Sequence, residues 1–334
     1  MRLCPAALLL LLAVSPSAAF LWEKKPDPAH ERLMAAAISR LDDGDCAGAV
    51  DSINSLLALG PSREIKERAY YCLGKCHEAL GSPDRAINTY RLAAALYQEN
   101  TLFPKALAEL YLANGFYDKA AEIYRPLVGK DPARRRAPCT DCGESRPDPS
   151  SYQLNLGLAR SYAGMGALAS AAAGYAAARA SGGGDPAFMA EYARCLESMR
   201  DFTGALALLN EARAAAPSDT ALTRLMARVS ARTGAYSRAA GLAEEACGPV
   251  CRDGGLLFEK GMYLLMAGDR AGALAALDAA APLLPAEDQS LALVRGLALR
   301  GLGRAAEAAA ELETVSAGDS SFLAGLARAA GEKK

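Results

Sequence analysis

Nine cysteines are the side chains of this 334-residue chain that could most readily do chemistry. Cys139 and Cys142 form a CxxC pair beside three arginines, and positive charge of this kind lowers the pKa of a thiol and favours disulfide exchange. Cys247 and Cys251 form a second close pair in the stretch CGPVC. Because close pairs are usually structural disulfides in an oxidising compartment, we predict a disulfide within each pair. A thiol-handling factor that uses the CxxC pair is the alternative.

Cys46, Cys72, Cys76 and His77 have the residue types of a zinc site. However, His77 directly follows Cys76, so on a helix their side chains would diverge by about 100°, and we predict no metal. Cys46 is expected to begin one helix, and Cys76 is expected to end the helix that follows it. Antiparallel packing would bring these two ends together, which predicts a Cys46–Cys76 disulfide.

Catalytic motifs are scarce in the sequence. It has two histidines, His30 and His77, and it lacks the HExxH, GxSxG and GxxxxGK[ST] motifs. Gly164, Gly166 and Ala169 fit a GxGxxA dinucleotide pattern, but no strand is expected before them, so we interpret them as a turn. We expect His77 to pack in the core rather than to act as a base. The sequence therefore predicts a protein that is not an enzyme and uses no cofactor.

The first 19 residues have the layout of a secretory signal peptide. Arg2 precedes an apolar run from Ala6 to Val14, which is too short to span a bilayer, and Ser17 and Ala19 follow as small residues. This predicts cleavage after Ala19 and export to the periplasm or the cell exterior. The formal net charge of −1 gives no argument for nucleic acid or an anionic membrane as a partner.

Alanine recurs at a nearly fixed interval along the rest of the chain. The interval is 34 to 37 residues, except for one interval of 51 between the third and fourth of these anchors. The anchor alanines are Ala49, Ala86, Ala120, Ala171, Ala205, Ala239, Ala273 and Ala308. A glycine stands five residues before each anchor, except that Arg200 takes this place once. Another alanine or glycine stands twelve residues before each anchor.

An interval near 34 residues accommodates two helices of about 12 to 14 residues and two tight turns. Glycine would form the turn between the two helices, because a turn there requires a backbone conformation that other residues avoid. Small residues on both helices would let the helix axes approach closely. No segment alternates with period two, so the sequence predicts an all-α fold without strands.

This pattern resembles the tetratricopeptide repeat family, and the segment YYCLGKCHEALGSPDRAINTYRLA carries the resemblance most closely. The resemblance covers about residues 30 to 320 but lacks the tryptophan often found early in each repeat. It implies a right-handed solenoid of helical hairpins. The expected organisation is a signal peptide (1–19), a lead segment (20–29), repeats 1–3 (30–132), a loop insert rich in Cys, Arg and Pro (133–151), repeats 4–8 (152–319), and a capping helix with a tail (320–334).

The resemblance implies that the first helix of each repeat lines a concave trough that binds a partner. The basic residues that the family pattern places in this trough are Lys75, Lys105, Arg160, Arg194, Arg224, Arg228 and Arg232. They predict an acidic segment or a terminal carboxylate as the ligand. The alternative is a stripe neutralised by Glu78, Glu109 and Glu197, which are placed on the same side.

The last two repeats place apolar residues in the trough instead. These residues are Phe258, Met262, Leu265, Met266, Leu293 and Leu297. Methionine-rich surfaces adapt to varied peptides, but the amphipathic C-terminal segment could cover them instead. The sequence therefore predicts an exported, non-enzymatic scaffold that binds a protein or peptide segment. A carrier of anionic envelope glycans is a further alternative.

Overall fold

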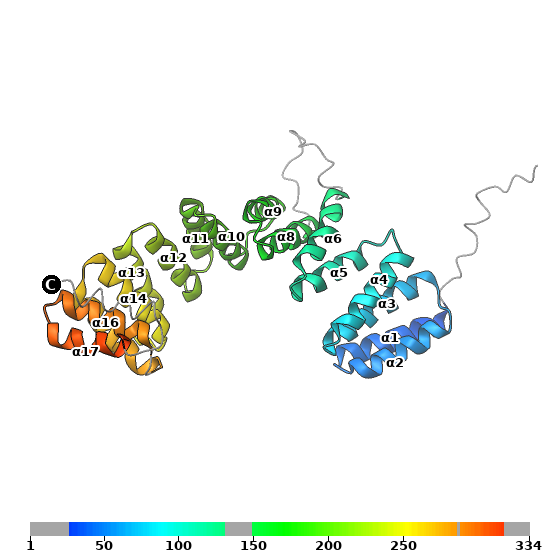
Figure 1. The fold of residues 1–334 in the computed structure, drawn as a ribbon. Helices are drawn as coiled ribbons and strands as arrows, with labels where there is room; N and C mark the ends of the chain where they lie inside the picture. The colour runs from blue at the N-terminus through cyan, green and yellow to red at the C-terminus, as the bar shows by residue number, and fades with distance from the viewer. Residues whose placement is uncertain (1–26, 131–148, 286–287, 317–334) are drawn as a thin grey trace, which may run out of the picture. The chain divides into compact units, whose positions relative to one another are not determined.

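The computed structural model describes residues 27–130, 149–285 and 288–316. The chain divides into two compact units, unit 1 (residues 1–130) and unit 2 (residues 131–334), and each is described by itself. The described residues form 16 α-helices and one short 3-10 helix (Figure 1). The predicted signal peptide, Cys139, Cys142 and the predicted capping helix lie outside the described residues.

Unit 1 is a series of three antiparallel helix pairs (Figure 1). The helices are α1 (Pro28–Asp42), α2 (Cys46–Ala58), α3 (Arg63–Ala79), α4 (Pro83–Leu96), α5 (Leu102–Ala113) and α6 (Tyr117–Lys130). Each second helix also packs against the first helix of the following pair. Helix α1 begins at Pro28, two residues before the predicted start of the repeats at residue 30.

Unit 2 continues the same arrangement with five pairs (Figure 1). The helices are α8 (Pro149–Gly164), α9 (Leu168–Ala180), α10 (Pro186–Ser198), α11 (Phe202–Ala215), α12 (Thr220–Arg232), α13 (Tyr236–Cys247), α14 (Gly254–Ala267), α15 (Arg270–Ala280), η2 (Ala281–Leu283), α16 (Gln289–Gly301) and α17 (Ala305–Ser316). Helix α8 begins at Pro149, within the predicted insert of residues 133–151. The prediction of an all-α fold of paired helices is confirmed.

The turns inside the pairs explain the glycine column of the sequence. The seven glycines of the column have φ between 65° and 93°, a left-handed conformation that costs a residue with a Cβ atom free energy. Arg200, which breaks the column, has φ 64° and is the one residue other than glycine with positive φ in the described part of the chain. The turn therefore keeps its backbone geometry where the sequence departs from the pattern.

Close helix crossing explains the two columns of small residues. All eight anchor alanines are buried, and so are the alanines and glycines twelve residues before them. At Gly74 an added Cβ atom would lie 2.2 Å from Cε1 of Tyr90, a fully buried ring on the paired helix α4. Glycine occurs here because the facing side chain is large, so the two columns fix how closely each pair packs.

Aspartate side chains begin most of the helices in unit 2. Asp185, Asp201, Asp219, Asp253, Asp269 and Asp288 each accept a hydrogen bond from a backbone N–H group in the first turn of the next helix. A cap of this kind stabilises a helix by about 1 kcal/mol. These caps therefore help to define where six of the helices of unit 2 begin.

Candidate functional site

The thiols of unit 1 are close but not bonded. Cys46 and Cys76 are buried, Cys72 is half-buried, and all three are free thiols, so the predicted Cys46–Cys76 disulfide is not formed in the structure. Burial, together with the neighbouring thiols of Cys46 and Cys72, raises the pKa of Cys76 to about 11. Antiparallel packing thus brings the sulfurs together as predicted, while burial keeps the Cys76 thiol protonated and therefore unreactive.

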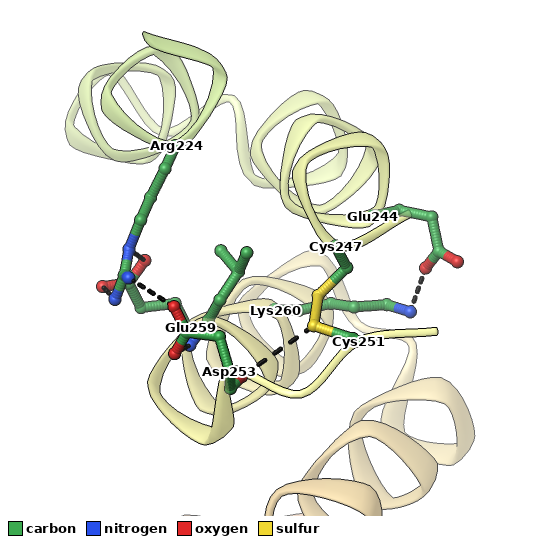
Figure 2. The surroundings of a disulfide bond; sticks show 8 residues. Arg224, Glu244, Cys247, Cys251, Asp253, Glu259 and Lys260 are labelled. Carbon is green, nitrogen blue, oxygen red and sulfur yellow. Dashed lines mark hydrogen bonds and ion pairs between the residues drawn. A yellow bond between two sulfur atoms is a disulfide. The ribbon is translucent and has the colours of Figure 1, made fainter. Parts of the chain in front are cut away.

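The second predicted pair is bonded. Cys247, the last residue of α13, forms a disulfide with Cys251 in the connection to α14, which confirms that prediction (Figure 2). Two residues further on, Asp253 caps α14 by accepting a hydrogen bond from Leu256 N at 3.0 Å. The disulfide therefore closes the loop that leads into α14. Its role in the structure is to brace the connection between two repeats rather than to offer a reactive thiol.

Charged side chains on both sides of this disulfide tie the helices together. Arg224 of α12 donates to Asp253 at 2.9 Å and to both carboxylate oxygens of Glu259 in α14 at 2.9 and 3.0 Å (Figure 2). On the other side of the loop Lys260 pairs with Glu244 of α13. Arg224 therefore uses each of its three nitrogens to bind the next repeat and serves as a link between repeats.

The predicted basic residues of unit 1 are paired within their own helices. Lys75 Nζ lies 3.1 Å from a carboxylate oxygen of Glu78, which also accepts a hydrogen bond from the Tyr90 hydroxyl at 2.6 Å. Lys105 Nζ lies 4.0 Å from Glu109. These are pairs three or four residues apart on exposed helix surface, where a pair stabilises a helix by only about 0.2–0.5 kcal/mol.

Arg160 of α8 is paired across repeats. Its Nε and Nη2 each donate to one carboxylate oxygen of Glu191 in α10 at 2.8 Å, a bidentate pair, and the Tyr175 hydroxyl donates to the same carboxylate at 2.7 Å. Burial alone would raise the pKa of the Glu191 carboxyl, but the hydrogen bonds from Arg160 and Tyr175 outweigh it and lower the pKa. Glu191 is therefore charged and holds α8 against α10.

Glu197 is the one acidic residue of α10 that is almost fully buried, with 7% of its surface exposed. Arg228 of α12 donates to its two oxygens at 3.1 and 2.9 Å, and Arg232 Nε lies 3.5 Å from one of them. Both arginine side chains keep about half of their surface exposed. One carboxylate is therefore shared by two arginines, which leaves positive charge at the surface of α12.

Arg194 is the exposed arginine between these two clusters. Its side chain makes no hydrogen bond or ion pair to any residue that the structure describes, although its charge helps to lower the pKa of Glu191. On this part of α8, α10 and α12 four guanidinium groups, those of Arg160, Arg194, Arg228 and Arg232, face two carboxylates, those of Glu191 and Glu197. The surplus is positive, and Arg194 is its most available member.

Apolar side chains occupy the corresponding positions of the last two pairs. Met266 of α14 is 60% exposed and Leu297 of α16 is 37% exposed. Phe258, Met262 and Leu265 are half-buried, whereas Leu293 is buried and offers little surface. We call the exposed side of α8, α10, α12, α14 and α16 the first-helix face of unit 2. It is basic over its first three helices and apolar over its last two.

The acidic partners of the arginines were only partly found from the sequence. The family pattern places Glu197 on the same side as the arginines, but it does not single out Glu191, Asp253 or Glu259. A signal was available, because each missed residue follows its arginine by 29 to 35 residues, about one repeat. The same spacing joins the second helices, where Arg179 pairs with Glu211 at 2.6 Å and Arg213 pairs with Glu245 at 2.7 Å.

In residues 27–130, 149–285 and 288–316, no group of three or more His, Cys, Asp or Glu side chains is arranged to hold a metal ion, and this includes Cys46, Cys72, Cys76 and His77. Within these ranges, no helix has both the length and the apolar character needed to cross a bilayer.

Comparison with known proteins gives the family of the repeats. Two family models, both described as Tetratricopeptide repeat, match residues 34–101 and 162–229. The C-terminal part of a TPR repeat-containing protein from Cytophaga hutchinsonii superposes with a TM-score of 0.52, at 15% identity over 63% of this chain and 77% of that chain. At this identity the similarity concerns the fold. No curated protein matches the chain.

Two more solved structures are similar at lower scores. YrrB, described as a TPR protein with an unusual peptide-binding site, has a TM-score of 0.49 and 16% identity over 64% of this chain and 97% of its own. PilF of Pseudomonas aeruginosa has the same score and identity over 64% of this chain and 89% of its own. The assignment of the repeats rests on the two family models and on the helix pairs themselves.

Proposed function

We propose that this chain, a tetratricopeptide repeat protein, is a scaffold that holds an acidic, amphipathic segment of another protein on the first-helix face of unit 2. One observation carries the proposal. Exposed side chains at equivalent positions of successive repeats are sorted by chemistry, with guanidinium groups on α8, α10 and α12 and apolar groups on α14 and α16. A segment with carboxylates at one end and large apolar side chains at the other would complement both.

The basic part would provide recognition. All the side-chain donors of Arg194 are available to a carboxylate of the ligand. A further carboxylate of the ligand could reach the half-exposed side chains of Arg228 and Arg232. Arginine binds carboxylates through two parallel hydrogen bonds, which fixes orientation as well as charge. Because Glu197 already takes part of this charge, we expect moderate affinity that falls as salt is added.

The apolar part would provide burial. Met266 and Leu297 expose much of their surface, and Met262 and Leu265 lie beside Met266 in the sequence of α14. Methionine adapts its shape to different ligands because its side chain is unbranched and flexible. Covering such side chains removes apolar surface from water at roughly 25 cal/mol per Å². An anionic glycan would use the arginines but would gain nothing from this patch.

Equilibrium binding of designed peptides tests the proposal. The probe is a fluorescein-labelled amphipathic peptide of leucine and glutamate, and the comparison peptide has lysine in place of glutamate. We expect only the acidic peptide to bind, with Arg194→Glu weakening it about fivefold to tenfold. The matched control is Arg238→Glu, because Arg238 is an exposed arginine on the second helix α13. Equal binding by Arg194→Glu and wild type would refute the basic part.

The apolar part has its own test. Met266→Gln should weaken the acidic peptide about fivefold, since it removes an exposed apolar side chain without changing charge. Leu92→Gln on α4, where Leu92 is 50% exposed, is the control. Heparin serves as the polyanionic glycan probe. If Met266→Gln leaves peptide binding unchanged while heparin binds more tightly than the peptide, the glycan alternative is favoured instead.

We also propose that the protein is exported. The N-terminal sequence has the signal-peptide layout described above, and the Cys247–Cys251 disulfide suits an oxidising compartment. Fractionation of the native host followed by N-terminal sequencing should find the protein outside the cytoplasm with Phe20 as its first residue. Recovery of the uncleaved chain from the cytoplasm would reject export and would leave the binding proposal untouched.

A further inference from the structure

Unit 1 contains a cavity of its own on the first-helix side. It has a volume of about 320 Å³ and lies between α1, α3 and the beginning of α5. Its lining residues are Ile38, Glu64, Glu67, Arg68, Tyr71, Cys72, Asn100 and Leu102. Pockets for small ligands begin at roughly this volume, so the cavity can accept one long side chain rather than a whole helix.

Almost every polar group of this cavity already has a partner. Glu67 accepts hydrogen bonds from Arg63 Nε at 2.9 Å and from Asn100 Nδ2 at 2.7 Å. The side-chain oxygen of Asn100 accepts from the backbone N–H of Leu102 at 3.0 Å. The amide of Asn100 and the carboxylate of Glu67 are therefore both used inside the protein.

The positive charges near the cavity are matched in the same way. Arg68 Nη1 donates to both carboxylate oxygens of Glu31 in α1, at 2.9 and 3.2 Å. Lys75, the next cation along α3, is paired with Glu78. Cys72 stays a neutral thiol because burial raises its pKa. The net charge that a ligand would meet therefore depends on the remaining carboxylate.

That carboxylate belongs to Glu64. It is exposed, it lies in the first turn of α3, and it makes no hydrogen bond or ion pair with any residue of unit 1 that the structure describes. The other walls are apolar, with Ile38 and Tyr71 half-buried and Leu102 42% exposed. A chain of methylene groups that ends in a positive charge matches this combination, because such side chains bury the stem and keep the charged head at the surface.

We propose that the cavity of unit 1 binds a lysine or arginine side chain of a partner protein, with the methylene stem against Ile38, Tyr71 and Leu102 and the cationic head on Glu64. The charge preference is opposite to that of the first-helix face of unit 2. The proposal does not rest on the function proposed for unit 2, since it uses a different unit and different residues.

The test uses the full chain and four fluorescein-labelled alanine–glycine peptides that differ at one central residue, which is lysine, arginine, norleucine or glutamate. Norleucine is the key comparison because it keeps the apolar stem of lysine and lacks the charge. We expect the lysine and arginine peptides to bind about threefold to fivefold more tightly than the norleucine peptide at low salt, and the glutamate peptide to bind least.

Three variants decide the outcome. Glu64→Gln should abolish the preference for lysine over norleucine, whereas Glu122→Gln, at an exposed glutamate of α6, should keep it. Leu102→Ala should weaken the binding of the lysine and norleucine peptides equally, because it removes an apolar side chain that lines the cavity and leaves the charge unchanged. The proposal is overturned if the lysine and arginine peptides show no saturable binding to wild type, if norleucine binds as well as lysine, or if Glu64→Gln retains the preference.

Discussion

The two units use charge on their first helices in different ways. In unit 1 the predicted basic residues Lys75 and Lys105 pair within their own helices, and Arg68 with Glu31 is the ion pair that joins α1 to α3. In unit 2 the pairs of Arg160, Arg224 and Arg228 all join one repeat to the next. An arginine that binds a carboxylate of a neighbouring repeat stabilises the packing of the two repeats. A lysine that pairs with a glutamate three or four residues further along its own helix stabilises that helix alone.

The basic residues that the sequence predicts at equivalent positions of the repeats therefore do not form one uniform binding surface. The bridging arginines of unit 2 already bind carboxylates of the protein itself. The positive charge that remains available at the surface belongs to Arg194 and to the exposed parts of the Arg228 and Arg232 side chains. In unit 1 the charged side chain that lines the cavity without a partner among the described residues is the carboxylate of Glu64. The two candidate sites therefore offer unpaired groups of opposite sign.

The largest expected effect breaks one unit and leaves the other intact. Gly74→Val should destabilise unit 1 by about 2–3 kcal/mol, because the new side chain would collide with the buried ring of Tyr90. Gly129→Ala is the control in the same unit, since an added Cβ atom there meets nothing within 4 Å. Hydrogen exchange resolved by peptide should show loss of protection in residues 27–130 alone; equal loss in residues 149–316 would show that the units unfold together.

The second effect compares a bridging carboxylate with a local one. Glu197→Gln should destabilise unit 2 by about 1–2 kcal/mol, because it removes a buried charge shared by two arginines that can still reach water. Glu109→Gln in unit 1 should cost at most about 0.5 kcal/mol, since Glu109 is half-exposed and 4.0 Å from Lys105. Urea unfolding measures both, and equal costs would contradict the distinction between the units.

The third effect concerns the turn that lacks glycine. Arg200→Gly should stabilise unit 2 by about 0.5–1 kcal/mol, because glycine adopts the observed φ of 64° without a steric cost. Gly166→Ala, at a turn with φ 74° in the same unit, should have the opposite sign. Thermal unfolding gives both shifts. If Arg200→Gly lowers the midpoint, the arginine side chain must make a stabilising interaction that outweighs the strained backbone.

Most of the fold could be predicted from the sequence because it depends on residues at fixed spacing. The anchor alanines and the glycine column act locally, through close crossing and positive φ, and a period near 34 residues defines the pair. Even Arg200 keeps the turn, since the flanking helices determine the backbone there. Element ends were less predictable, and α1 and α8 both begin earlier than expected because proline at the first turn supports a helix start.

The candidate sites were less predictable because they depend on side-chain direction across repeats. The rotation of α10 relative to α8 determines that Arg160 binds Glu191. Sequence spacing narrows the candidate carboxylates but does not identify this one. The cavity of unit 1 combines residues from α1, α3 and α5, and its unmatched charge emerges only after the pairs of Glu67 and Arg68 are known. Antiparallel packing likewise makes Cys46 and Cys76 neighbours as the sequence predicts, but both are free thiols in the structure, which the spacing of the cysteines does not predict.

The smallest expected effect is a dependence of stability on pH in unit 2. The folded-state pKa of Glu191 is lowered below its ordinary value of 4.5, so its contribution is fully present above about pH 4.5 and is lost as the pH falls through the folded pKa. Acid should therefore loosen the contact of α8 with α10, where Arg160 and Tyr175 bind this carboxylate. Glu191→Gln should remove this part of the pH dependence, which is measured by urea unfolding between pH 7 and pH 3. The control is Glu211→Gln on α11, which should change the pH dependence less because its ion pair is more exposed. An unchanged acid dependence in Glu191→Gln would mean that other carboxylates set the acid stability of unit 2.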